Sequence, residues 1–262
     1  MAVDKEDVTA LSVEEVVGKI RGPKQTKVTL AIERGEKAEK QDIEIMRDSI
    51  DLSSVKWEDK GNGIIYLRVS FFNDNTWSEF DKAVKEIMLK SPKSIILDLR
   101  GNPGGYLDTS VKVAAEWLTK DQGVVVSEKN KDGEVKKYNA DEGKHRFVGV
   151  KTVILVDEGT ASGSEIVTGA LQDYGVATVV GKTTFGKGSV QEFEVLPDGS
   201  ALKITIAEWY TPKDRQINKV GLNPDITVDG DMFVQKDKTT GDKAEDYIDK
   251  GMEKALEILK IK

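Results

Sequence analysis

The chain has 262 residues, of which 38% are hydrophobic and 32% are charged, with a formal net charge of −7 and no cysteine. This composition is typical of one large globular domain, or of one domain with a small appendage. The negative charge argues against a nucleic-acid binder whose affinity comes from phosphate neutralisation. The lack of cysteine excludes disulfides, thiol chemistry and cysteine-built zinc sites.

No window approaches the roughly 20 consecutive apolar residues that a membrane-spanning helix requires. Residues 1–7 lack the basic and apolar regions of a signal peptide. From the residues alone, we therefore expect neither a transmembrane segment nor a targeting signal in this chain.

The beginning of the chain predicts a helix and two strands. Ser12 and Glu15 have the spacing of a capping box in front of an apolar run, and a Gly-Pro pair follows that run. Three small elements bury too little surface to be stable alone, so this region is expected to be an appendage or part of a domain. The expected elements are a helix over residues 13–20 and strands over 27–34 and 41–46.

The rest of the chain alternates between strand and helix patterns, which is typical of an α/β fold. Near the end, the pattern predicts antiparallel strands and an amphipathic helix. The expected strands cover residues 64–69, 94–99, 152–156, 176–180, 190–195 and 201–210, with a hairpin over 124–138. The expected helices cover residues 79–89, 109–118, 165–174 and 243–259.

The stretch GTASGSE, Gly159 to Glu165, places three hydroxyls between an apolar strand and a helix. One interpretation is structural, since Ser162 and Glu165 have the spacing of a capping box. The other is catalytic, because a serine at a helix N-terminus lies beside free backbone N–H groups that can hold an oxyanion. The two interpretations are compatible, and the N–H of Gly163 would face a tetrahedral intermediate in both.

A second stretch, Gly181 to Ser189, nearly matches a phosphate-binding loop. Such a loop should open a helix, whereas the residues after Gly188 alternate like a strand. The acidic strand that could hold magnesium also precedes the loop instead of following it. Nucleotide hydrolysis is therefore the weaker hypothesis for this stretch.

A serine nucleophile requires a base, and the chain offers few candidates. The single histidine, His145, lies in a charged run that is typical of an exposed loop, which leaves Lys187. A lysine acts as a base only when neutral, and burial favours the neutral form. We expect Phe185 and Val190 to exclude water from Lys187, and Gln191, four residues on, to orient its amine without adding a charge.

A third stretch, Asp98 to Tyr106, follows a predicted strand and contains Asn-Pro-Gly-Gly. Ligands in open α/β sheets bind at the carboxyl ends of strands. Alone this is turn chemistry, but beside a serine nucleophile its glycines become a second source of oxyanion donors.

In order and spacing, these three stretches resemble the motifs of the carboxyl-terminal processing proteases, also called tail-specific proteases. The segment Trp209 to Arg215 and the segment Val220 to Ile226 resemble that family as well. The family consists of serine peptidases with a serine–lysine catalytic pair, so the resemblance implies that activity.

Carried over position by position, the resemblance implies that Ser162, and not Ser164, is the nucleophile and that Lys187 is the base. It makes Gln191 the residue that orients the lysine. The oxyanion hole is expected at the N–H of Gly163 with a glycine of the pair Gly104 and Gly105, without deciding which. Alanine is usual in the family at position 163, so Gly163 is a departure. The resemblance also places three supporting residues near the site: Glu165, Asp173 and Thr184.

The same resemblance implies a fold and a domain division. Residues 1–52 are similar to the carboxyl-terminal half of a PDZ domain, so the chain is expected to begin inside that domain. Residues 53–262 are expected to form the catalytic core with a C-terminal helix. The expected fold class is α/β, a mixed-sheet peptidase core layered like crotonase and ClpP, with a partial PDZ unit in front.

The function that follows is a serine endopeptidase that cuts proteins near apolar carboxyl-terminal tails. The expected partners are protein or peptide substrates with apolar carboxyl termini and no nucleic acid, and association into a homo-oligomer is left open. No metal or cofactor is expected, and the substrate would lie along a sheet edge, with residues 201–210 as one candidate. The resemblance implies an extracytoplasmic location, and the alternative function is a non-catalytic peptide- or lipid-binding module.

Overall fold

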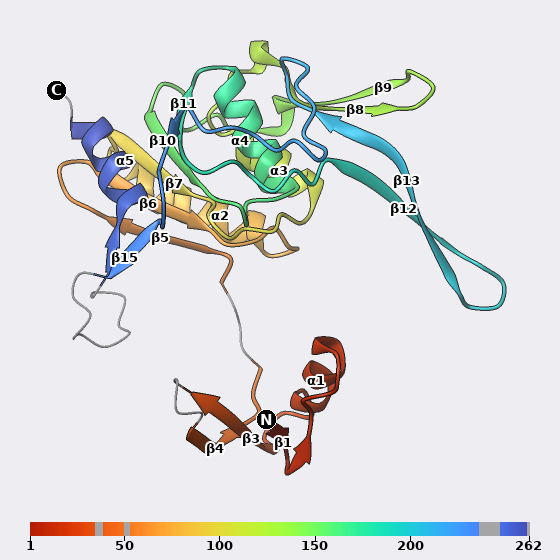
Figure 1. Ribbon diagram of the computed structural model, residues 1–262. Helices are drawn as coiled ribbons and strands as arrows, with labels where there is room; N and C mark the ends of the chain where they lie inside the picture. The colour runs from red at the N-terminus through yellow and green to blue at the C-terminus, as the bar shows by residue number, and fades with distance from the viewer. Residues whose placement is uncertain (35–38, 50–52, 236–246, 261–262) are drawn as a thin grey trace. The chain divides into compact units, whose positions relative to one another are not determined.

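Two units make up the chain, Met1–Leu52 and Ser53–Lys262. The computed structural model, drawn in Figure 1, describes residues 1–34, 39–49, 53–235 and 247–260. No helix in these ranges is long and apolar enough to cross a membrane.

In its described residues, the first unit has one helix and a four-stranded sheet. The expected helix is confirmed as α1 (Val13–Ile20), and the backbone N–H of Ser12 donates to the Glu15 carboxylate at 2.8 Å, as in a capping box. The two expected strands are also confirmed as β3 and β4, which pair antiparallel. The strands, in the sheet order β2-β1-β3-β4, are Glu6–Asp7, Ala2–Val3, Lys27–Arg34 and Glu39–Met46.

The second unit is built on a six-stranded sheet in the order β14-β11-β10-β7-β6-β5. All neighbouring strands are parallel except β5, which pairs antiparallel with β6. Parallel neighbours need crossover helices, which is why the strand and helix patterns alternate along this part of the chain. In sheet order, the strands are Ile226–Thr227, Ala177–Gly181, Lys151–Val156, Ser94–Asp98, Ile64–Val69 and Val55–Asp59.

Helices cover both faces of this sheet, as Figure 1 shows. Successive side chains of a strand point to opposite faces. Ile95 and Leu97 of β7 therefore pack in the larger apolar core with α2, α3 and α4, whereas Ile96 packs in a second core with α5. The helices are α2 (Thr76–Met88), α3 (Leu107–Ala114), α4 (Gly163–Asp173) and α5 (Lys250–Lys260).

A second sheet in this unit has the strand order β12-β13-β8-β9. Its strands are Ser189–Val195, Ala201–Tyr210, Val124–Asn130 and Val135–Asn139. The β12–β13 hairpin reaches out from the body of the unit (Figure 1). Because β13 pairs with β12 on one side and with β8 over Ala207–Tyr210 on the other, the predicted sheet edge at residues 201–210 is wrong for Ala207–Tyr210. The edge strands of this sheet are β12 and β9.

The C-terminal helix is shorter than expected. We predicted a helix over residues 243–259, of which 243–246 lie outside the described residues. Tyr247–Asp249 forms strand β16, which pairs with β15 (Phe233–Gln235), and α5 begins at Lys250. Asp249 explains this start, because its carboxylate accepts the N–H of Met252 at 2.9 Å, as a helix N-cap does.

Candidate active site

Three neighbouring parallel strands, β7, β10 and β11, carry the three motifs at their carboxyl ends. β10 lies between the other two. Its end leads into the turn at residues 157–162, β7 into the loop at 99–105, and β11 into the loop at 182–187. Segments far apart in sequence therefore meet at one end of the sheet, where α/β folds place their ligands.

The turn before α4 exposes one hydroxyl out of three. Ser162 is the N-cap of α4, and its backbone has φ 55° and ψ −118°, a conformation that L-residues rarely adopt. Strain of this kind is concentrated at functional sites. Ser162 is half-buried, whereas Thr160 and Ser164 are both 0% exposed. Ser162 is therefore the hydroxyl of this stretch that a substrate can reach.

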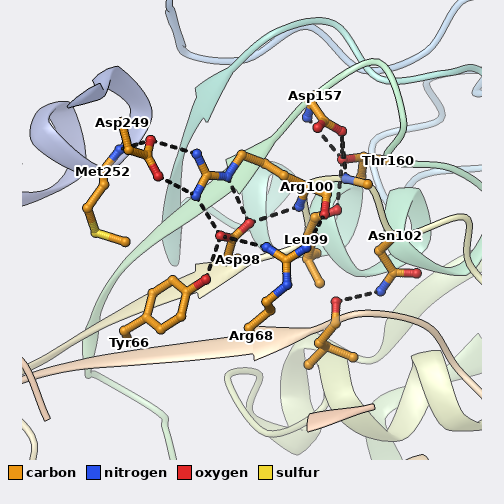
Figure 2. Close-up of polar contacts among 12 residues, drawn as sticks. Tyr66, Arg68, Asp98, Leu99, Arg100, Asn102, Asp157, Thr160, Asp249 and Met252 are labelled. Atoms are coloured by element: carbon orange, nitrogen blue, oxygen red, sulfur yellow. Dashed lines mark hydrogen bonds and ion pairs between the residues drawn. The ribbon is translucent and has the colours of Figure 1, made fainter. Parts of the chain in front are cut away.

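The two buried hydroxyls join this turn to the loop after β7. Thr160 Oγ1 donates to the carbonyl of Leu99 at 2.9 Å, a contact drawn in Figure 2. The carbonyl of Asn102 lies 2.8 Å from Ser164 Oγ and accepts the N–H of Ala161 at 2.9 Å. These buried bonds fix the loop against the turn that carries Ser162.

Hydrogen bonding distinguishes the two glycines of that loop. A methyl group on Gly104 would lie 2.6 Å from Ser162 Cβ, so only glycine allows this approach. The N–H of Gly104 already donates to Asn102 Oδ1 at 2.8 Å. The N–H of Gly105 has no partner in the part of the chain that the structure describes. Gly105 has φ 143°, and a side chain there would collide with the Phe72 carbonyl.

The close approach of Ser110 explains the glycine at position 163, where the family that the sequence resembles usually has alanine. A methyl group on Gly163 would lie 2.3 Å from Ser110 Oγ, so alanine would require Ser110 to move. Ser110 Oγ donates to the carbonyl of Tyr106 at 2.9 Å, which holds it in place. Gly163 begins α4, and its N–H has no partner among the described residues.

Glu165 joins the turn to the loop after β11, an arrangement that we call the Glu165 clasp. Its carboxylate is 0% exposed. Oε2 accepts the N–H of Ser162 at 2.8 Å and that of Lys187 at 2.9 Å. Oε1 accepts the N–H of Gly186 at 2.8 Å and the hydroxyl of Thr184. Because Ser162 and Lys187 share one oxygen, their backbones are held within two hydrogen-bond lengths of each other.

The surroundings of Lys187 differ from those expected. We predicted that Phe185 and Val190 would exclude water, but Lys187 is exposed and Phe185 is 66% exposed. Val190 is half-buried and packs against the core instead. The amine of Lys187 and the hydroxyl of Ser162, both described, are not hydrogen-bonded to each other. The clasp thus brings the two backbones together while the side chain of Lys187 remains in solvent.

We predicted that Gln191 lies on the same strand face as Lys187, and this is wrong. Lys187 precedes β12, which starts at Ser189, and a register irregularity lies between Val190 and Gln191. Such a bulge breaks the alternation on which the four-residue spacing depended. Gln191 is exposed, pairs with Thr205 across the hairpin, and makes no hydrogen bond to Lys187 in the described structure.

Two other candidates lie away from this site. Asp173 ends α4, about 15 Å from Gly163 at the rise of an α-helix, where it pairs with Arg215. His145 is half-buried rather than fully exposed, and its Nδ1 lies 3.0 Å from the carbonyl oxygen of Ala115. The contacts of Asp173 and His145 are thus typical of residues that support the fold. Within the described residues, no group of three or more His, Cys, Asp or Glu could hold a metal ion.

The sequence patterns did not single out Arg100, which pairs with Asp98 at the start of the loop at residues 99–105. We call this segment the glycine loop. Arg100 Nη2 donates to Asp98 Oδ2 at 2.6 Å, and the two side chains are 5% and 0% exposed. Burial would raise the pKa of Asp98, but the hydrogen bonds and charge of Arg100 outweigh it and hold that pKa below its ordinary value. The signal available in the sequence was a charged pair at the end of an apolar strand.

This lowered pKa predicts acid destabilisation of the second unit. A carboxyl whose pKa is lower in the folded state adds stability above its unfolded pKa of 3.8, and loses it as the pH falls toward the folded value. We expect the free energy of unfolding, measured with urea, to be constant near neutral pH and to fall below about pH 4. Removal of the carboxyl in Asp98→Asn should flatten that fall, and an unchanged slope in this variant would contradict the prediction.

Comparison with known proteins relates this arrangement to one family. A model of peptidase family S41 matches residues 63–228. The chain is 41% identical over 226 residues to a probable CtpA-like serine protease of Staphylococcus epidermidis, covering 86% of this chain and 45% of that protein. A probable CtpA-like serine protease of Staphylococcus aureus is 41% identical over 227 residues, covering 87% and 45%. The chain thus spans less than half the length of these relatives.

Solved structures agree with the mixed α/β fold. A photosystem II D1 C-terminal processing protease matches with a TM-score of 0.67 and 29% identity, covering 87% of this chain and 62% of that one. A lipoprotein from Streptococcus agalactiae matches with a TM-score of 0.57 and 20% identity, covering 68% and 67%, which is a likeness of fold alone.

Proposed function

Because the chain belongs to peptidase family S41, we propose that it is a serine-type endopeptidase in which Ser162 is the nucleophile and Lys187 the general base. The observation that carries this proposal is the Glu165 clasp, which holds the backbones of both residues on one carboxylate oxygen. The strained backbone and accessibility of Ser162 support its role.

The reaction proceeds through an acyl-enzyme. Neutral Lys187 takes the proton of Ser162 Oγ while Oγ attacks the carbonyl carbon of the scissile peptide. The oxyanion accepts hydrogen bonds from the N–H groups of Gly163 and Gly105, neither of which has a partner among the described residues. The C–N bond then breaks, and the leaving amine takes the proton from Lys187. Water that Lys187 deprotonates hydrolyses the ester and frees Ser162.

Bound substrate would shield the amine of Lys187 from water, to which it is exposed in the free protein. A lysine amine is more readily neutral when water is removed from it. Lys187 is exposed, so a polypeptide that crosses the site would cover it. The base is therefore activated when the substrate is bound, and Gln191 is proposed to orient the amine in that complex.

The edge of β12 is the proposed binding surface for the extended substrate. β12 begins two residues after Lys187, and its outer edge has no partner strand in the described structure. An extended peptide can add to such an edge through main-chain hydrogen bonds. A cavity of about 510 Å³ opens beside Tyr106, the residue after Gly105, and Trp77 and Leu107 contribute to its wall. The lining also includes Asp74, Asp108 and Lys112, so the proposed preference for apolar tails rests on the family resemblance and not on this cavity.

Cleavage of paired substrates tests the proposal. We would compare an unstructured polypeptide that ends in apolar residues with the same polypeptide ending in acidic residues, using Ser162→Ala as the blank. The wild type should cleave the apolar substrate with a kcat/KM at least about tenfold higher. Binding of both polypeptides without cleavage would instead indicate a non-catalytic binding module, and equal cleavage would contradict the preference for apolar tails.

A further inference from the structure

The guanidinium of Arg100 is held by two carboxylates that lie far apart in sequence, those of Asp98 and Asp249 (Figure 2). Asp98 accepts from Nε at 3.0 Å and from Nη2 at 2.6 Å. Asp249 accepts from Nη1 at 2.7 Å and from Nη2 at 2.8 Å. Asp249 ends β16 and lies 149 residues from Arg100 in sequence. The C-terminal segment therefore accepts two of the four hydrogen bonds that the side chain of this buried cation donates.

This cation lies at the start of the glycine loop of the candidate active site. Arg100 is 5% exposed and precedes Gly101, whose N–H donates to Asp157 Oδ1 at 2.8 Å. Figure 2 shows Asp249 on one side of the Arg100 side chain, with Asn102 and Thr160 on the other. The loop that ends in Gly105 is therefore bonded to the Ser162 turn through Leu99, Gly101 and Asn102, and Arg100 at its start pairs with Asp98.

We propose that Asp249 is a positioning residue for the reaction, which holds Arg100 from the C-terminal segment and so sets where the N–H of Gly105 points. This inference rests on the proposed peptidase function. An oxyanion donor stabilises a transition state only if it lies at hydrogen-bond distance from the developing charge. Without Asp249, Arg100 keeps Asp98 but loses the two bonds that fix the other side of its guanidinium plane.

Asp249 also caps α5, and this second role allows an effect on catalysis to be distinguished from a loss of stability. Its Oδ1 also accepts the N–H of Met252 at 2.9 Å and so caps α5. Asparagine caps a helix about as well as aspartate, so Asp249→Asn retains the cap and removes the charge. Asp249→Glu keeps the charge but is a poor cap. The exposed Glu253, in the first turn of α5, provides a matched control, because Glu253→Gln removes a charge that does not contact Arg100.

The test uses the full chain, with kcat and KM measured on the apolar-tailed polypeptide and the thermal midpoint Tm measured for each variant. We expect Asp249→Asn to lower kcat about 10- to 100-fold with little change in KM or Tm, as a small displacement of a catalytic group does. Asp249→Glu should recover most of kcat while its Tm falls, and Glu253→Gln should match the wild type. A kcat of Asp249→Asn within about twofold of the wild type, or losses of kcat that follow Tm, would overturn the proposal.

Amide hydrogen exchange over residues 101–105 supplies a measurement that does not depend on cleavage. We expect faster exchange in Asp249→Asn than in the wild type, Asp249→Glu and Glu253→Gln. If the wild type cleaves no substrate, the proposed function fails while the exchange still decides whether Asp249 positions the loop. Equal exchange in all four proteins would contradict the positioning role.

Discussion

Ser162→Ala and Lys187→Ala are each expected to lower kcat about 10⁴-fold or more, because a nucleophile and its base act as a unit. Lys187→Arg should be as inactive as Lys187→Ala, since a guanidinium retains the positive charge but does not lose its proton in proteins. The measurement is the rate of cleavage of the apolar-tailed polypeptide at saturating substrate.

Lys182 provides the control for this prediction. It lies in the same loop, where it pairs with the exposed Glu158 at 3.0 Å, and Lys182→Ala should cleave at close to the wild-type rate. Activity in Lys187→Arg would mean that the residue acts through its charge alone.

Glu165→Ala is expected to lose both stability and activity. The substitution removes the acceptor of four donors, which are the N–H groups of Ser162, Gly186 and Lys187 and the hydroxyl of Thr184. Buried donors left without partners cost free energy, so we expect unfolding in urea to show a loss of about 3 to 5 kcal/mol. Cleavage should fall at least about 100-fold, because the loop that carries Lys187 is no longer fixed to the turn.

Two substitutions calibrate that loss. Glu165→Gln keeps one oxygen acceptor but turns an amide toward backbone N–H groups, so its stability and activity should lie between those of the wild type and Glu165→Ala. Glu158→Ala removes a carboxylate that is 67% exposed, and should change the free energy of unfolding by less than about 0.5 kcal/mol. Wild-type cleavage by Glu165→Ala would show that the clasp does not position the catalytic pair.

Patterns within single elements predicted much of the fold. The capping box at Ser12 and Glu15 predicted α1 at its observed bounds, and the alternation at residues 189–195 predicted a strand where a phosphate-binding loop would need a helix. Boundaries were less accurate where packing extends or ends an element. α2 starts at Thr76, three residues before the expected position, and Asp249 starts α5 at Lys250.

The sequence by itself determined which strand ends carry the candidate site, because turn residues, caps and apolar periodicity are local properties that neighbouring residues specify. Only the tertiary structure decided how the side chains lie within that site. Three features depend on which segments pack together: the exposure of Lys187, the bulge before Gln191, and the N–H of Gly105, which has no partner in the ranges that the structure describes. Asp249 reaches Arg100 across 149 residues, a contact that no local pattern encodes, because the sheet and α5 bring the two together only after the chain has folded.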